Sequence, residues 1–239
     1  MYQWLYVIRS LGSEVMSVSS AKIMRQLAQV WIDFSSQLDQ ISIVKKINQG
    51  KLRIEDYKSL LLNHRQQVID GGRWIARAAS GIDAQFSDLR EKFIQHCYTE
   101  HQDYKMLEQN YVSVGGDLKT IQNYEKNIGS EALSSFMFHK ASQSNPFDLL
   151  GSMFIIEGLG KNKAGDWGKK IKSQLNLEDT QVSFYLYHAE HDQDHLKEFD
   201  EILSNPNILA IPDIDKKMIK TAKVTSRLYC LQLEELDNI

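Results

Sequence analysis

Three histidines and four acidic residues crowd into the thirteen-residue stretch YHAEHDQDHLKEF, residues 187–199, although the whole chain has only seven histidines. His188, Asp192 and His195 stand at positions i, i+4 and i+7, which places them on one face of an α-helix. Imidazole and carboxylate groups on one helix face are typical of a metal-binding or catalytic stripe. A solvated or salt-bridged helix face is the alternative.

A second segment has the same spacing. His96, Glu100 and Asp103 also stand at i, i+4 and i+7, in LREKFIQHCYTEHQDYKMLEQNY. We expect one helix over about residues 83–112, and the three side chains would then form a second polar stripe facing the first. Glu100 could instead pair with a lysine or an arginine.

Glu157 is a lone carboxylate in LLGSMFIIEGLG, directly after the apolar run 153–156. A buried carboxylate without a partner costs several kcal/mol, so Glu157 needs a cation or hydrogen-bond donors if it faces the core. Together with the two stripes it predicts a non-haem iron or manganese site between helices. No thiolate belongs to the stripes, which argues against structural zinc. Glu100 and Glu157 are also the candidate catalytic carboxylates, because a carboxylate can act as a general acid or base.

His64, in LLLNHRQQV, could reach the same cavity from another helix. We favour a structural role for it, as a hydrogen-bonded core histidine or a surface histidine. Trp74, Phe184 and Tyr187 are interpreted as core residues, since aromatic side chains bury large apolar areas. For Tyr185, core packing and substrate contact both remain open.

Helical periodicity dominates the chain, and the strict alternation of β-strands is absent, so we predict an all-α fold. The three prolines all lie outside the strongly periodic segments or near their starts. Gly71 and Gly72 weaken one predicted helix by roughly 1 kcal/mol each and could allow another helix to approach closely. Gly151, Gly158 and Gly160 could do the same. Predicted helices span about residues 21–38, 41–48, 54–80, 83–112, 130–143, 146–175, 178–203 and 213–236.

The composition describes an ordinary globular protein of 239 residues, with 42% hydrophobic and 25% charged residues and a net charge of −3. We expect one domain over residues 21–239 and an N-terminal extension over residues 1–20, with Met16 as an alternative start. There is no basic excess to favour nucleic acid. The apolar N-terminal run is too short to span a bilayer, so no membrane partner is expected. Cys97 and Cys230 form no Cys-x-x-Cys pair, which fits a reducing cytoplasm.

Several segments resemble the heme oxygenase-like superfamily, which includes TenA-type thiaminases and the PQQ-synthesis oxidase. They are RQQVIDGGRWIARAAS, EHQDYKMLEQNYVSVGG, GSMFIIEGLG and the H-x3-D-x2-H motif of His188, Asp192 and His195. Within the superfamily, the chain is most similar to the heme oxygenase-like diiron oxidases, also called iron-containing redox enzymes. The resemblance covers roughly residues 20–235. It implies a compact all-helical bundle with a central cavity, and a homodimer.

The resemblance also implies a ligand set. In that branch the final motif supplies metal ligands, which correspond here to His188, Asp192 and His195. A glutamate on the preceding long helix corresponds to Glu157.

The earlier helix of that branch offers a glutamate and a histidine. Glu100 matches the glutamate, whereas His96 and Asp103 compete for the other place, so one-metal and two-metal sites both remain open. The implied cofactor is one or two non-haem iron ions, or manganese, without haem. The implied reactants are dioxygen and a small organic substrate, such as an amine, an amino acid or a fatty acid.

Two other functions fit the same residues. A metal-independent enzyme, either a thiaminase-like hydrolase or a cofactorless oxidase, would use the carboxylates for acid–base work. A non-catalytic helical ligand-binding module would close the stripes into internal salt bridges. A true heme oxygenase fits less well, because its axial histidine lies early in the chain and the first histidine here is His64.

Overall fold

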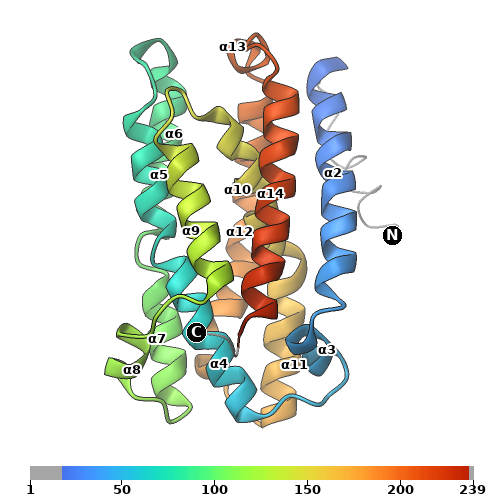
Figure 1. The fold of residues 1–239 in the computed structure, drawn as a ribbon, viewed down its shortest axis with the longest axis vertical. Helices are drawn as coiled ribbons and strands as arrows, with labels where there is room; N and C mark the ends of the chain where they lie inside the picture. The colour runs from blue at the N-terminus through green and yellow to red at the C-terminus, as the bar shows by residue number, and fades with distance from the viewer. Residues whose placement is uncertain (1–17, 237–239) are drawn as a thin grey trace.

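The computed structural model describes residues 18–236, apart from the side chains of residues 18, 19, 191–198 and 200. Long helices run side by side along the vertical axis of Figure 1. No strand occurs in residues 18–236, which confirms the predicted all-α class. The predicted start at Met16 and nearly all of the predicted extension lie outside the described residues. The longer helices are α2 (Val18–Leu38), α4 (Ile54–Val68), α5 (Gly71–Ser80), α6 (Ser87–Glu100), α7 (Tyr104–Ser113), α9 (Ile128–Ala141), α10 (Leu150–Leu159), α11 (Gly165–Leu175), α12 (Ser183–Leu203) and α14 (Ile214–Glu234).

Short elements connect these helices. They are α3 (Ser42–Asn48), α8 (Leu118–Gln122), α13 (Pro206–Leu209), three single 3₁₀ turns and a π-helical turn at Gly160–Ala164 that joins α10 to α11. The sequence did not predict α8 and α13, which are too short to show a periodic stripe. None of the helices in residues 18–236 is both long enough and apolar enough to cross a membrane. Both cysteines are free thiols.

Helix α14 lies at the centre of the bundle, with α2 on one side and α9 on the other (Figure 1). It also packs along α10. The apolar stripe predicted for α2 faces this core, and Leu27, Phe34 and Leu38 are fully buried. A continuous apolar core of this kind fixes the helices relative to one another, because protein interiors pack as densely as organic crystals.

Two predicted helices are each broken into two. The predicted helix 54–80 is interrupted at Ile69 and Asp70, next to the glycine pair, and becomes α4 and α5. Asp70 is buried at this corner, where it accepts hydrogen bonds from Arg73 and Ser134. The prediction of one continuous helix over 83–112 was also wrong, because a turn at residues 101–103 separates α6 from α7.

Gly72 explains the close packing at this second break. A Cβ atom on Gly72 would lie 2.7 Å from the Cα atom of His101, closer than real Cβ contacts come. The predicted role of the glycines is therefore confirmed for Gly72, but not for Gly71, where a Cβ would meet nothing within 4 Å. Gly151 and Gly158 likewise allow close approach, to the backbone of α14 and to Trp31.

We predict opposite effects for alanine at the two neighbouring glycines. Gly72→Ala should lower the free energy of unfolding by about 1–3 kcal/mol, because the added methyl group meets a backbone that cannot move aside. Gly71→Ala is the matched control and should be neutral or stabilising by up to about 1 kcal/mol. Urea unfolding of both variants measures the difference. Equal stabilities would show that α5 and the turn at His101 are not in close contact.

Candidate metal centre

A cavity of about 90 Å³ lies among α4, α5, α6, α10, α12 and α14. This volume is enough for several water molecules or a small organic molecule. One group of its lining side chains is polar and comprises His96, Glu100, Glu157 and His188. The other walls are largely apolar and include Trp74, Ile75, Met153, Ile156, Leu159, Trp167 and Phe184. An apolar cavity with a few convergent polar groups is the usual form of a ligand-binding or active site.

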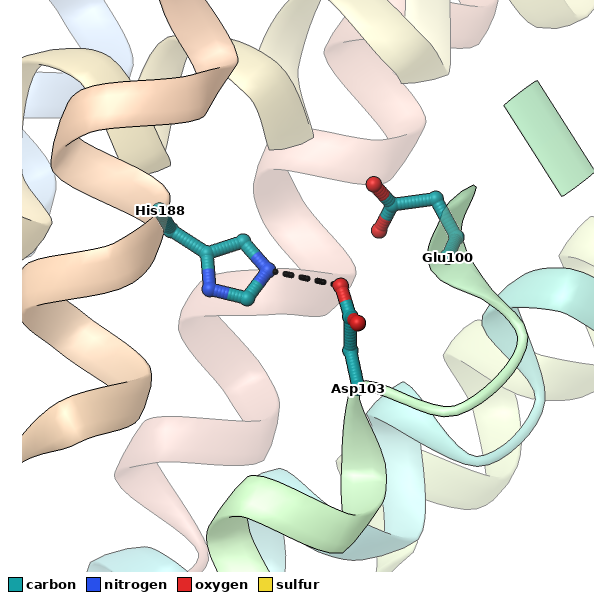
Figure 2. Close-up of side chains that lie close together, drawn as sticks. All are labelled: Glu100, Asp103 and His188. Atoms are coloured by element: carbon teal, nitrogen blue, oxygen red, sulfur yellow. Dashed lines mark hydrogen bonds and ion pairs between the residues drawn. The ribbon is translucent and has the colours of Figure 1, made fainter. Parts of the chain in front are cut away.

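Glu100, Asp103 and His188 come together from three different elements (Figure 2). Glu100 is the last residue of α6, Asp103 directly precedes α7, and His188 lies on α12. Each offers one ligand atom, and these three atoms all lie within 4.8 Å of one another. Within this cluster, His188 Nε2 lies 3.1 Å from Asp103 Oδ2.

The hydrogen bonds of His188 indicate which ring nitrogen carries its proton. His188 Nδ1 lies 2.8 Å from the carbonyl oxygen of Phe184, which can only accept a hydrogen bond, so Nδ1 must donate. In the neutral ring, Nε2 then presents a lone pair toward the carboxylate of Asp103. Two acceptors at 3.1 Å need a proton or a metal ion between them. A backbone carbonyl that fixes the tautomer in this way is typical of histidines that bind metals.

His96 and Glu157 form a second imidazole–carboxylate pair. Their closest atoms, His96 Nε2 and Glu157 Oε1, are 3.2 Å apart, and each residue is only 7% exposed. The buried carboxylate of Glu157 thus has a hydrogen-bonding partner, His96, as its burial requires. This pair is close enough to Glu100 to affect its ionisation.

The ionisation of Glu100 is strongly perturbed by its surroundings. Burial, followed by the negative charge of Glu157, raises the pKa of Glu100 to about 7, and Asp103 acts in the same direction. The two histidines of the cluster oppose the shift. Without a metal, the cluster therefore holds an extra proton on a carboxyl group near neutral pH. A bound cation would replace that proton.

Helix α7 is fixed against α4 by a buried ion pair, which also positions Asp103. Arg65 Nε and Nη2 donate to Glu108 Oε1 at 3.0 and 2.8 Å, with both side chains about 90% buried. A charge-assisted bond in which two donors share one acceptor restricts the orientation of both side chains. Asp103 precedes α7, so this pair limits its movement relative to α4.

Asn110 connects α7 directly to the start of α12. Its amide nitrogen donates to Ser183 Oγ at 2.8 Å, and its amide oxygen accepts from the backbone N–H of Phe184 at 3.2 Å. These bonds satisfy polar groups at the beginning of α12. Because His188 lies one turn further along, Asn110 sets the spacing between His188 and the α7 side of the cluster.

The π-helical turn at Gly160–Ala164 begins three residues after Glu157 and contributes Gly160 and Ala164 to the cavity wall. The turn packs against α12, the helix that bears His188. Single π-helical turns inside α-helices are uncommon and occur frequently at functional sites. Here the turn widens the helix where the cavity needs space.

The structure brings five of the seven predicted ligands to one region: His96, Glu100, Asp103, Glu157 and His188. The predicted geometry of one stripe was wrong, since Asp103 does not continue the helix of His96 and Glu100. It reaches the cluster from the start of α7, after the turn. The backbones of Asp192 and His195 lie on α12, but their side chains lie outside the described residues. The ligand roles of all seven residues stay predictions.

Of the other aromatic and histidine assignments, one changes. Tyr187 was expected in the core but is 38% exposed. His64 is a buried, hydrogen-bonded histidine, as favoured, and it also lines the cavity together with Tyr185. Tyr229 lines the cavity too, and the sequence analysis did not single it out.

Comparison with solved structures places the chain in a known fold. It superposes on a domain of unknown function with a heme oxygenase-like fold from Shewanella denitrificans, with a TM-score of 0.81, 16% identity and 93% coverage of both chains. It also superposes on a TenA homologue from Pseudomonas syringae (TM-score 0.71, 12% identity, 91% of this chain and 93% of that one). A TenA homologue from Pyrococcus furiosus gives a TM-score of 0.70 at 13% identity, over 92% of this chain and 100% of that one.

These matches show that the chain has the heme oxygenase-like fold, as the sequence predicted. At such low sequence identity the matches show only the fold, and a shared fold does not determine the reaction that a protein catalyses. No protein-family model matches the chain, and no curated protein matches its sequence.

Proposed function

We propose that this protein is a non-haem iron enzyme of the heme oxygenase-like fold, which oxidises a small organic substrate with dioxygen. The observation that carries the proposal is the cluster of Glu100, Asp103 and His188 beside a cavity with apolar walls. Imidazole and carboxylate ligands from facing helices suit iron and manganese. The resemblance to the diiron oxidase branch supports the same proposal.

The donor atoms fit a metal ion with only a small adjustment. Metal–ligand distances of about 2.1 Å keep any two ligand atoms within about 4.2 Å of each other. The three atoms lie within 4.8 Å, so the largest gap has to close by no more than about 0.6 Å, which rotation of the Glu100 side chain can supply. The tautomer of His188 already leaves Nε2 as the available ligand atom.

Each part of the site has a role in this proposal. Bound iron would supply the binding and activation of dioxygen. The carboxylates of Glu100 and Asp103 offset the charge of the metal, and His188 supplies a nitrogen ligand whose orientation is fixed by the carbonyl of Phe184. His96 and Glu157 either hold a second ion or keep a proton beside the first. The apolar walls position the organic substrate and exclude bulk water.

Anaerobic titration with ferrous iron, followed by exposure to air, tests the proposal. We expect saturable uptake of one or two ions per chain and a change in the absorption spectrum when oxygen is admitted. The absence of saturable uptake would reject the proposal. Measured binding of manganese under the same conditions would separate a preference for iron from a general site for divalent cations.

Iron affinity should depend on pH in a defined window. Because the pKa of Glu100 is raised to about 7, protons compete with the metal for this carboxylate below neutral pH. We expect the affinity to fall about tenfold between pH 8 and pH 6 from this group alone. Titrations in non-coordinating buffers at both pH values measure the change. A pH-independent affinity would mean that Glu100 is not a ligand.

A second candidate is a metal-independent enzyme that uses the same carboxylates for acid–base chemistry. The specific observation in its favour is that His96–Glu157 and His188–Asp103 form imidazole–carboxylate pairs through protein atoms alone. Such pairs can hold and move a proton beside a substrate. TenA homologues share the fold. Activity or substrate binding that survives treatment with a strong chelator would favour this candidate over the iron enzyme.

A further inference from the structure

His64 forms a buried hydrogen-bonded group with two tyrosines. His64 Nδ1 lies 2.9 Å from the hydroxyl of Tyr185, and His64 Nε2 lies 2.9 Å from the hydroxyl of Tyr229. All three residues are at least 95% buried, and all three line the cavity. They come from α4, α12 and α14, so the group is held by three separate helices.

The group of His64, Tyr185 and Tyr229 has more hydrogen-bond donors than its own acceptors can use. Burial, followed by the electrostatic effect of nearby His188, lowers the pKa of His64 to about 4, so the His64 ring is neutral and carries a single N–H. That N–H donates to one tyrosine, and the other tyrosine donates its O–H to the bare nitrogen. The tyrosine that accepts from His64 keeps an O–H proton with no further acceptor among the described residues.

We propose that this remaining hydroxyl, on Tyr185 or Tyr229, binds a neutral hydrogen-bond acceptor of the substrate, such as a carbonyl, ether or hydroxyl oxygen. The proposal rests on the cavity being the substrate pocket of the proposed function, and it adds the chemical class of the substrate. A buried hydroxyl without an acceptor is unfavourable, so a ligand that supplies one gains binding energy. His64 can exchange its tautomer, which lets either tyrosine present the donor.

The charge of the cavity favours a neutral acceptor over a carboxylate. His64 is uncharged, no lysine or arginine lines the cavity, and the lining histidines His96 and His188 already pair with Glu157 and Asp103. In the metal-free protein, an anion at the tyrosines would therefore have to compete with these carboxylates for a positive charge. Burying an unpaired charge costs far more than one hydrogen bond returns. Apart from Gln67, the remaining walls, which include Trp74 and Trp167, are largely apolar. The inferred substrate is therefore a small, mainly apolar molecule with one neutral oxygen or nitrogen acceptor at one end.

Two probes of nearly equal shape test this inference. Cyclohexanone has a carbonyl oxygen where methylenecyclohexane has a CH₂ group, so the pair isolates one hydrogen bond. In the wild-type protein the ketone should bind about threefold to tenfold more tightly. In the double variant Tyr185→Phe/Tyr229→Phe this ratio should fall to about one. Titrations followed by NMR, in the presence of a chelator, measure all four affinities without depending on iron.

A second measurement covers the case in which the double variant does not fold. The ¹³C carbonyl resonance of cyclohexanone bound to the wild-type protein should lie downfield of its position in a hydrocarbon solvent, as hydrogen bonding requires. Equal affinities of the two probes, an unchanged ratio in a folded double variant, a carbonyl resonance at the hydrocarbon position, or no binding of the ketone would each overturn the inference. Failure of iron uptake would instead reject the proposed function and leave these results unaffected.

Discussion

Replacing His188 with alanine is expected to lower the affinity for ferrous iron about a hundredfold or more. Among the described residues, His188 is the sole nitrogen donor in the cluster with Glu100 and Asp103. Even residues that only orient a ligand typically contribute tenfold to a hundredfold to metal affinity. The loss should appear in the anaerobic titration as a weak, non-saturating response. Any oxygen-dependent change in absorption should disappear with it.

His139→Ala is the matched control for this variant. His139 lies on α9 and is exposed. The His139→Ala variant should therefore bind iron as tightly as the wild-type protein does. The melting temperature of both variants shows whether any loss arises from unfolding. Wild-type iron affinity in a folded His188→Ala variant would contradict the proposed ligand set.

Replacing Glu100 with glutamine is expected to stabilise the metal-free protein while it abolishes tight metal binding. The pKa of Glu100 is about 7 in the folded protein, against about 4.5 for an ordinary glutamate. The unfolded chain therefore releases this proton at lower pH than the folded chain does. The stability of the wild-type apoprotein then falls as pH rises from about 4.5 to about 7, by up to about 3 kcal/mol.

Glutamine cannot ionise, so the variant lacks this loss of stability. Its free energy of unfolding should exceed that of the wild type by about 1–3 kcal/mol at pH 8 and by little at pH 4.5. Glu91→Gln, at an exposed position on the same helix, should show no such pH-dependent gain. Urea unfolding at the two pH values, with a chelator present, measures the difference. A variant less stable than the wild type at pH 8 would show that Glu100 is held by favourable contacts as an anion.

The sequence predicted the fold class and much of the cluster because both depend on local patterns. Helical periodicity and the scarcity of proline indicate helices directly, and the i, i+4, i+7 spacing selected His96, Glu100 and His188. The burial argument selected Glu157, whose partner proved to be His96.

Tertiary contacts determined what the sequence missed. The turn between α6 and α7 accompanies the close approach of Gly72 to His101, a contact between residues 29 positions apart that no local pattern contains. The sequence analysis thus assigned Asp103 to the correct site but placed it on the wrong helix. Tyr229 and His64 are 165 residues apart in the sequence, so their hydrogen bond is visible only in the folded chain.

Anomalous X-ray diffraction at the iron edge, from crystals grown anaerobically with ferrous iron, tests the central claim most directly. The account predicts an anomalous peak within about 2.3 Å of His188 Nε2 and of carboxylate oxygens of Glu100 and Asp103. Iron bound only elsewhere on the protein, or no peak in the cavity at saturating iron, would contradict it.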